Sequence, residues 1–200
     1  MLDLNKIKSF DALSKDEQVE ALTLIDKWKN LNARDKCKSD FLEFVKYQWD
    51  GFIMGRHHKI LAKKLNRIAN GKCKRLMVML PPRHTKSEFA STYFPAWMMG
   101  LNPSLKIIQA THTAELAVRF GRRVRNIIDS EEYQTIFPDI SLSGDNKSAG
   151  RWTTDDGGEA FYSGVGGAIT GRGADLLIID DPHSEQDAMS PTAMDAAWEW

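Results

Sequence analysis

The sequence predicts an α/β fold, in which a mostly parallel central sheet is flanked by helices and preceded by a helical N-terminal appendage. Two short apolar runs, residues 76–80 and 176–179, have the length of buried strands. Chemically distinctive residues follow each run, Lys86-Ser87 after the first and Asp180-Asp181 after the second. The intervening chain has room for further strand–helix units, which is typical of α/β domains.

Composition fits a soluble globular protein. The chain has 200 residues, of which 42% are hydrophobic and 27% charged, enough for one α/β domain and an appendage. The formal net charge is zero, which argues against a uniformly basic nucleic-acid binder. The charges are sorted, however: residues 51–87 contain ten Lys/Arg and no Asp/Glu, and residues 173–200 contain seven Asp/Glu and no Lys/Arg. A solvated face and an anion-facing surface both explain the basic segment.

Cysteine usage and apolar runs predict a protein of the reducing cytoplasm. Cys37 and Cys73 form no C-x-x-C pair and suggest no disulfide scaffold. The first ten residues mix polar and apolar types, unlike a signal peptide. No apolar run approaches the roughly 18 residues of a membrane span, so no membrane partner is expected.

Residues 1–48 are predicted to form a helical leader and residues 49–200 the core domain. Ser14 and Glu17 match a capping box before a helix that reaches about Lys29, and Ser39 can cap a second helix. Each helix has an apolar stripe expected to pack against the rest of the protein. The stripes are Val19, Leu22, Ile25 and Trp28, then Phe41, Leu42, Val45 and Trp49.

A third helix is predicted over residues 57–69, ended by Asn70-Gly71. Its inward face would be Ile60, Leu61, Leu65 and Ile68, and its outer face Lys59, Lys63, Lys64 and Arg67. His57 and His58 are neighbours on this helix, so their side chains point apart and argue against a metal site.

The chain after residue 86 alternates helices and strands. A helix over 87–99 ends at Gly100 and is kinked or restarted at Pro95. A strand over 106–111 leads to a helix over 114–128. Residues 141–150 are small and polar and predict a loop, and a hairpin is predicted at 151–154 and 159–163. The 114–128 helix has four arginines that face solvent or touch a nucleic-acid backbone, namely Arg119, Arg122, Arg123 and Arg125.

Residues 80–87, Leu-Pro-Pro-Arg-His-Thr-Lys-Ser, lie between the first strand and a helix and predict a phosphate-binding loop. Lys86 would reach the β- and γ-phosphates of ATP, and the Ser87 hydroxyl would ligate Mg²⁺. The prolines lack N–H donors, so the loop amides that bind phosphate would come from Arg83, His84, Thr85, Lys86 and Ser87. Leu80 and Thr85 stand where the usual signature has glycine. The alternative is a strand–turn–helix junction with an exposed lysine.

Asp180 and Asp181 follow the apolar run 176–179, which predicts a strand buried on both faces. Ligands bind at the carboxyl ends of strands in open α/β sheets. We therefore expect Asp180 to hold Mg²⁺, directly or through water, and Asp181 to orient or activate a water. The alternative is a buried strand that ends in a solvent-facing turn.

Glycines precede this strand, in Gly164-Val-Gly-Gly167 and Thr170-Gly-Arg-Gly173. They allow close backbone approach or movement beside the predicted site. Arg172, between two glycines, is the arginine expected at the mouth of that site. An ordinary flexible turn is the alternative.

These ordered motifs resemble the ATPase domain of the large terminase subunit of tailed bacteriophages, over about residues 50–185. The resemblance implies a P-loop NTPase core of the ASCE type, with Lys86 and Ser87 in Walker A and Asp180 in Walker B. It matches Arg83 to the loop arginine of the family. Arg172 is the candidate for an arginine that acts in the neighbouring subunit's site.

The family consists of ATP-driven motors that move double-stranded DNA into a procapsid. The resemblance implies a homo-oligomeric, usually pentameric ring on the portal protein, with a small terminase subunit that delivers the DNA. Such a protein works in the host cytoplasm, transiently on the procapsid portal. Endonuclease activity, which belongs to a C-terminal domain of the family, is expected only in the full-length protein.

Two other functions stay open. A helicase-like nucleic-acid ATPase would share both Walker motifs, and a strand-separation assay would identify it. A nucleotide-binding assembly module without turnover is compatible with Thr85 in place of glycine, with Asp181 in place of the glutamate of many related ATPases, and with the absence of a coupling segment after the Asp180 strand. ATP turnover, measured beside ATP binding, would distinguish it.

Overall fold

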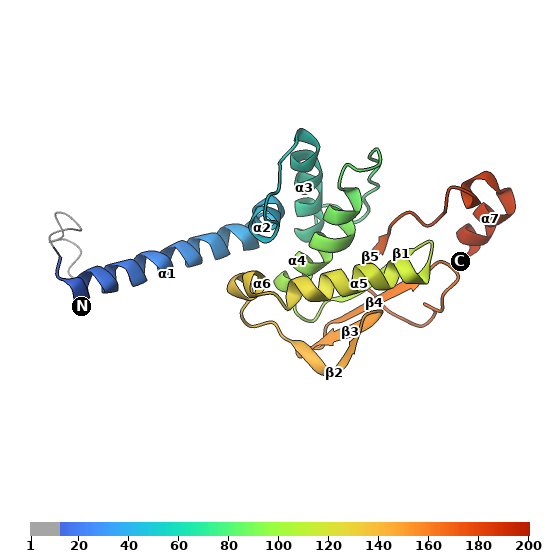
Figure 1. Ribbon diagram of the computed structural model, residues 1–200. Coiled ribbons are helices and arrows are strands. Elements are labelled where there is room, and N and C mark those ends of the chain that lie inside the picture. Colours follow the sequence, from blue (N-terminus) through green and yellow to red (C-terminus); the bar gives the residue numbers. More distant parts are fainter. Residues whose placement is uncertain (1–12) are drawn as a thin grey trace.

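The computed structural model describes residues 13–200, with residues 145–147 through their backbone alone. Its centre is a five-stranded sheet in the order β2-β3-β4-β1-β5 (Figure 1). β1 is parallel to β4 and β5, whereas β2–β3 and β3–β4 are antiparallel. The α/β class is confirmed, but the sheet is mixed and not mostly parallel. The strands are β1 (Lys106–Thr111), β2 (Leu142–Ser148), β3 (Arg151–Thr154), β4 (Glu159–Gly164) and β5 (Leu176–Ile179).

The antiparallel part of the sheet comes from a meander. The predicted hairpin forms β3 and β4, with Gly157 in the turn at φ +83°, where a side chain would be strained. β2 lies where a loop was expected. Leu142 is its only apolar residue, so no alternating pattern announced it, and its pairing with β3 shifts register after Leu142.

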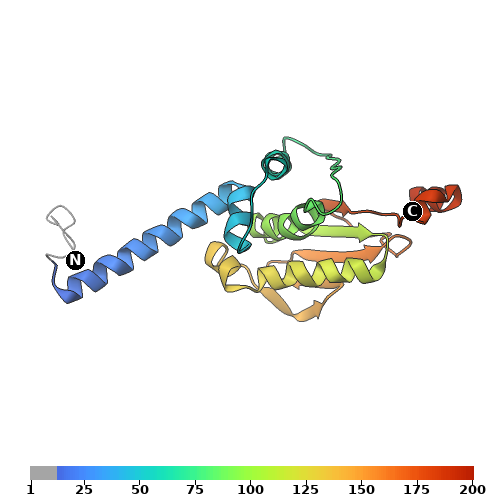
Figure 2. The same ribbon diagram turned by 45° about the horizontal axis from the view of Figure 1, so that its top comes forward.

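Helices cover the sheet and extend beyond it. α5 packs along β4 and β1 (Figure 2). None of the helices in the described part of the chain is both long and apolar enough to cross a membrane. The helices are α1 (Lys15–Ser39), α2 (Phe41–Gln48), α3 (Arg56–Ala69), the π-helix η3 (Glu88–Tyr93), α4 (Phe94–Leu101), α5 (Ala114–Ile128), α6 (Glu131–Ile136), the 3-10 turn η4 (Asp187–Met189) and α7 (Pro191–Glu199).

The leader differs in detail from the prediction, and its first twelve residues lie outside the described residues. The Ser14–Glu17 capping box starts α1 as expected. The helix does not end near Lys29 but continues to Ser39, because no Gly or Pro interrupts it. Asp40, and not Ser39, caps α2 by accepting hydrogen bonds from the Leu42 and Glu43 amides.

The apolar stripe of α1 is exposed. Val19 and Trp28 are 64% and 65% exposed, and Leu22 and Ile25 are 51% and 43% exposed. The expectation that this stripe packs against the rest of the chain is therefore wrong for the described residues. The C-terminal part of α1, around buried Cys37, packs against α2, α4 and α6, and toward its N-terminus the helix projects away from the sheet (Figure 1).

α2 packs against the chain that follows the 80–87 loop through an aromatic cluster. Phe41 is fully buried, and its ring centroid lies 5.5–5.6 Å from those of Phe89, Phe94 and Trp97. Phe89 and Phe94 belong to the helix that follows the 80–87 loop. The buried face predicted for α2 thus holds that helix in place.

Two predicted buried strands have different surroundings. Residues 76–80 form no strand: no backbone hydrogen bond joins them to a strand among residues 13–200, and Met77 and Met79 are both 82% exposed. The prediction of a buried strand before the 80–87 loop is therefore wrong. β5 lies at the edge of the sheet and, within the described part of the chain, is paired with β1 alone. Leu177 and Ile179 are 56% and 57% exposed, so the prediction that β5 is buried on both faces is wrong.

The helix after the 80–87 loop is also irregular. Instead of one α-helix over 87–99, a π-helix runs from Glu88 to Tyr93, and the Phe94 amide bonds the Phe89 carbonyl. Pro95 then lies in the first turn of α4. It has no N–H to continue an α-helical ladder, so the wider turn ends where α4 restarts.

Candidate active site

The loop of residues 80–87, called here the candidate phosphate loop, contains two residues in the left-handed backbone region. Arg83 has φ 61° and Thr85 has φ 60°. Such a conformation is strained for a β-branched residue. Thr85 is also the position where the usual signature has glycine, so the backbone keeps the glycine-like shape despite the substitution.

His58 of α3 stabilises this strained position. Its Nε2 lies 2.7 Å from Thr85 Oγ1, and its Nδ1 accepts a hydrogen bond of 2.8 Å from the Gly55 amide. Because Nδ1 accepts, the proton of the neutral ring is on Nε2, which donates to Thr85. Thr85 Oγ1 in turn donates to the His84 carbonyl. The ring of His58 is buried and lies 4.9 Å from both Phe52 and Phe89.

The pKa of His58 is lowered, first by burial and then by the nearby His57 and His84. A histidine whose pKa is depressed on folding stabilises the folded state above its unfolded pKa of about 6.5. That contribution is lost as the pH falls from about 6.5 through the lower folded pKa. We expect the free energy of unfolding, measured by urea titration, to fall over this window.

The matched test is His58→Phe, which keeps a ring against Phe52 and Phe89 but loses both hydrogen bonds. We expect it to lower the free energy of unfolding at neutral pH by about 1–2 kcal/mol and to flatten the pH dependence. His57→Phe, the neighbouring control, should retain the pH dependence. The same slope in both variants would show that His58 is not the titrating group.

Lys86 meets both carboxylates that the sequence placed in the site. Its Nζ lies 3.3 Å from Asp180 Oδ1 and makes a short ion pair with Asp181 Oδ1. Asp181 is 95 positions from Lys86 in the sequence, so only the fold brings the lysine and the carboxylates together. Burial favours the neutral amine, but hydrogen bonds and the charges of both carboxylates outweigh it and raise the pKa of Lys86.

The two carboxylates have different surroundings. Asp180 is buried, its amide donates to the Ala110 carbonyl of β1, and its Oδ2 accepts from Ser91 Oγ at 2.8 Å. Asp181 has a side chain that is 65% exposed and a φ of 44°. Asp180 is therefore held at the end of β5, while Asp181 turns toward solvent. The sequence analysis missed Ser91, which only its distance from Asp180 in the fold identifies.

An ion pair joins the base of the candidate phosphate loop to α5. Arg123 Nη1 donates to Glu88 Oε1 at 2.7 Å, and Nη2 binds the second oxygen. Glu88 directly follows Ser87. Of the four arginines on α5 that were considered for nucleic-acid contact, Arg123 is thus engaged in orienting the helix behind the loop.

The oxygen ligands suit Mg²⁺, which prefers carboxylate, hydroxyl and phosphate oxygens and often takes only one or two carboxylates from the protein. Asp180, Asp181 and Ser87 can supply such oxygens. Among residues 13–200, no group of three or more His, Cys, Asp or Glu forms a metal cage. A metal at this position would therefore depend on oxygens from a bound phosphate.

The other predicted loop residues are near the surface. Arg83 and His84 are exposed, and His84 Nδ1 donates to the Pro82 carbonyl at 2.9 Å. Ser87 is partly buried in the first helical turn. The amides of this turn begin the helix that runs into η3, which is the geometry that attracts anions.

Arg172 does not lie beside Lys86 in this structure. Its Nη1 donates to Glu159 Oε1 at 3.0 Å, and its guanidinium lies 4.0 Å above the Phe161 ring. Glu159 begins β4, whereas Asp180 follows the last residue of the parallel strand β5. Arg172 is thus near the opposite end of the parallel strands, and the expected position at the mouth of the chain's own site is wrong.

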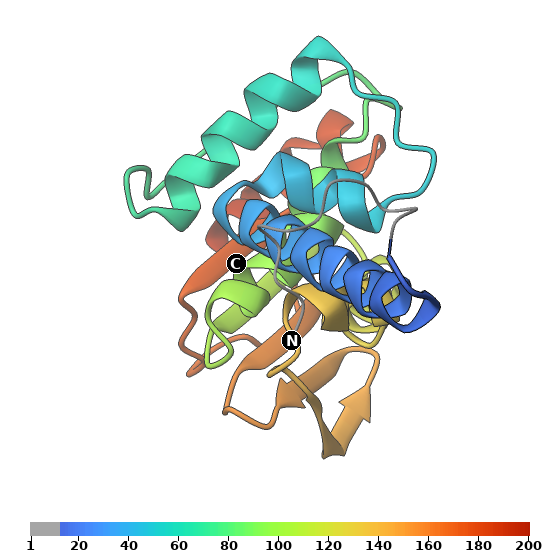
Figure 3. The same cartoon turned by 90° about the vertical axis from the view of Figure 1, so that its left-hand side faces the viewer.

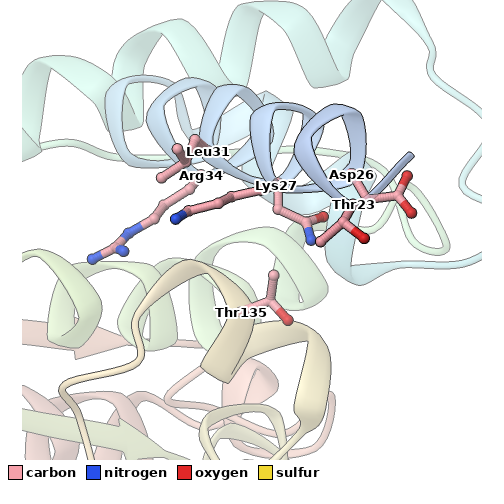
Figure 4. Close-up of a pocket in the computed structure, with 7 residues that line it drawn as sticks. Thr23, Asp26, Lys27, Leu31, Arg34 and Thr135 are labelled. Atoms are coloured by element: carbon pink, nitrogen blue, oxygen red, sulfur yellow. The ribbon is translucent and has the colours of Figure 1, made fainter. Parts of the chain in front are cut away.

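Two hollows of the described surface lie away from this site. One of about 440 Å³ lies between α1 and α6 and is lined by Thr23, Asp26, Lys27, Asn30, Leu31, Arg34 and Thr135 (Figure 4). Another, of about 220 Å³, lies around Arg172 and Glu159. Neither brings together a lysine, paired carboxylates and a helix N-terminus, so the candidate phosphate loop is the better site.

The sequence matches no protein-family model and no curated protein. The candidate site therefore depends on its own geometry.

Proposed function

We propose that the protein hydrolyses ATP, and that it is the ATPase part of a viral DNA-packaging motor of the terminase type. The fold would be a P-loop NTPase core. In this proposal the partners are double-stranded DNA, a portal protein, a small terminase subunit and further copies of the chain in a ring. The site works in the host cytoplasm, while the ring is on the procapsid portal.

The observation that carries the ATPase proposal is the contact of Lys86 with Asp180 and Asp181. A lysine in a strained loop at a helix N-terminus meets two carboxylates that follow a parallel strand. In P-loop NTPases a lysine of this kind binds the β- and γ-phosphates, and a carboxylate that follows a neighbouring strand holds Mg²⁺. The left-handed backbone of Thr85 adds support, because such strain is concentrated at functional sites.

In the proposed reaction, Lys86 leaves the carboxylates and binds the β- and γ-phosphates of ATP. Amides from Arg83 to Ser87 bind the same phosphates at the helix N-terminus. Bound Mg²⁺ would neutralise phosphate charge. Asp181, released from Lys86, orients a water for in-line attack on the γ-phosphorus, and the bond to the β-phosphate oxygen breaks to give ADP and phosphate.

Exchanging the two acids one at a time tests these roles. We expect Asp180→Asn to weaken Mg²⁺-dependent ATP binding about tenfold or more, because a metal-associated charge is lost. Asp181→Asn should keep ATP binding and reduce turnover by about 10²–10⁴, because water activation suffers. Binding is followed with a fluorescent ATP analogue and turnover by phosphate release.

Asp187→Asn is a control from the same acidic segment, since Asp187 bonds Ser184 and not Lys86. It should leave both quantities unchanged. If Asp180→Asn and Asp181→Asn bind and hydrolyse ATP alike, the assignment of separate roles fails. If the unmodified protein binds ATP in its ring without any turnover, a non-hydrolysing assembly module replaces the ATPase proposal.

A further inference from the structure

α3 and the segment that follows it carry eight exposed cations, called here the α3 basic face. All of its side chains are exposed, and residues 51–87 contain no carboxylate. Among residues 13–200, none of these cations forms an ion pair. The face consists of Arg56, Lys59, Lys63, Lys64, Arg67, Lys72, Lys74 and Arg75.

Packing fixes the direction in which this face points. Leu61, Ala62 and Leu65 of α3 are buried in the core. The opposite side of the helix is therefore free, and Figure 3 shows α3 at the periphery of the molecule. Lys59 and Arg67 are each four positions from Lys63, so these cations follow one another at about 6 Å along the helix.

We propose that the α3 basic face binds the phosphate backbone of double-stranded DNA. The inference rests on the proposed function, which makes a duplex the polyanion the protein meets. Arg56 and Arg67 are about 17 Å apart along the helix axis. A duplex carries about one negative charge per 1.7 Å of its axis, or roughly ten over that length. The regular row of unpaired cations matches this uniform charge.

A protein partner or a membrane fits the face less well. Protein interfaces are depleted in lysine and enriched in aromatic residues, whereas this face has five lysines and no aromatic residue. Among the described residues of α3, Ile60 is the one exposed large apolar side chain, 54% exposed against the prediction of an inward position. Insertion into a membrane surface needs an apolar face on the same helix, and that of α3 is already buried.

The same helix also touches the candidate phosphate loop. Its first turn contains His58, which donates to Thr85. A duplex bound on the α3 basic face would therefore lie on the element that supports the loop. This connection distinguishes α3 from α1, which also has exposed lysines. Among the described residues, no contact joins the lysines of α1 to the loop.

The test measures binding of a dye-labelled duplex of about 30 base pairs to the full chain by fluorescence anisotropy, between about 50 and 200 mM salt. The variant is Lys59→Gln, Lys63→Gln and Arg67→Gln together. We expect its affinity to fall at least about tenfold, and the slope of log affinity against log salt to become shallower by about 2–3.

The matched control carries Lys15→Gln, Lys27→Gln and Lys29→Gln on α1, all exposed and with the same change in net charge. Its affinity and slope should stay close to those of the unmodified protein. Equal weakening by the two triples, or none by the α3 triple, would overturn the proposal. If the α3 triple loses binding to vesicles of anionic lipid but keeps its binding to the duplex, the proposal is overturned as well.

Two further measurements keep the outcome decisive. If the α3 triple lowers the melting temperature, Lys72→Gln, Lys74→Gln and Arg75→Gln outside the helix provide the same comparison. Lys86→Ala should bind the duplex normally, whatever its ATP turnover. An inactive site with intact α3-dependent duplex binding refutes the ATPase alone, whereas intact turnover without α3-dependent binding refutes the duplex surface alone.

Discussion

Lys86→Ala is expected to reduce ATP turnover of the assembled motor by at least about 10²–10³-fold, the effect of removing one preorganised group that stabilises transition-state charge. In the absence of nucleotide, Lys86 is the cation between Asp180 and Asp181. In Lys86→Ala, the proposed lysine contact with the β- and γ-phosphates of ATP is lost. The measurement is steady-state phosphate release at saturating ATP.

The control for Lys86→Ala is Lys29→Ala, an exposed lysine of α1 outside the α3 basic face. It should leave turnover unchanged. Circular dichroism of both variants separates a loss of chemistry from a loss of fold. Normal turnover in folded Lys86→Ala protein would exclude the candidate phosphate loop as the ATP site.

Arg172→Ala is expected to reduce turnover of the assembled ring by about 10³–10⁵, the typical contribution of an arginine that completes a phosphoryl-transfer site. Within one chain Arg172 binds Glu159 and covers Phe161, away from Lys86. If it acts in a neighbouring subunit, the isolated chain should hydrolyse ATP slowly with or without it. Turnover is therefore compared below and above the concentration at which the ring assembles.

A mixing experiment separates action in trans from a structural role. Arg172→Ala subunits and Lys86→Ala subunits, each inactive alone, should regain part of the turnover when combined. Some interfaces then pair an intact lysine with an intact arginine. Glu159→Gln, which frees Arg172, should keep turnover in the ring. Mixed rings that contain both variants and stay inactive would rule out the trans role, and exposed Arg83 would be the next arginine to test.

Local patterns predicted a good part of the fold. The strand at 106–111, the hairpin at 151–154 and 159–163 and the helix at 114–128 all form, because each has a clear period and a clear end signal. The exposed cations of α3 were also predicted. The predicted burial of the α1 stripe and of β5 was wrong, since periodicity identifies an apolar face but not whether another element covers it.

The sequence predicted the charged residues of the site but not the residues that hold them in place. Lys86, Asp180 and Asp181 meet as the motifs suggested. The His58–Thr85 and Ser91–Asp180 contacts join residues 27 and 89 positions apart, and no short motif contains either pair. The predicted position of Arg172 was wrong. The flanking glycines allow its loop many directions, and the ion pair with Glu159 determines the one that it takes.

The free edge of β5 bears on how the isolated protein behaves in a concentrated solution. Along that edge, backbone N–H and C=O groups face outward next to the exposed side chains of Leu177 and Ile179. An unprotected edge of this kind is a template for pairing with a strand of another molecule. Purified chains would therefore associate through main-chain hydrogen bonds, and salt, which screens charges, would do little to disperse them.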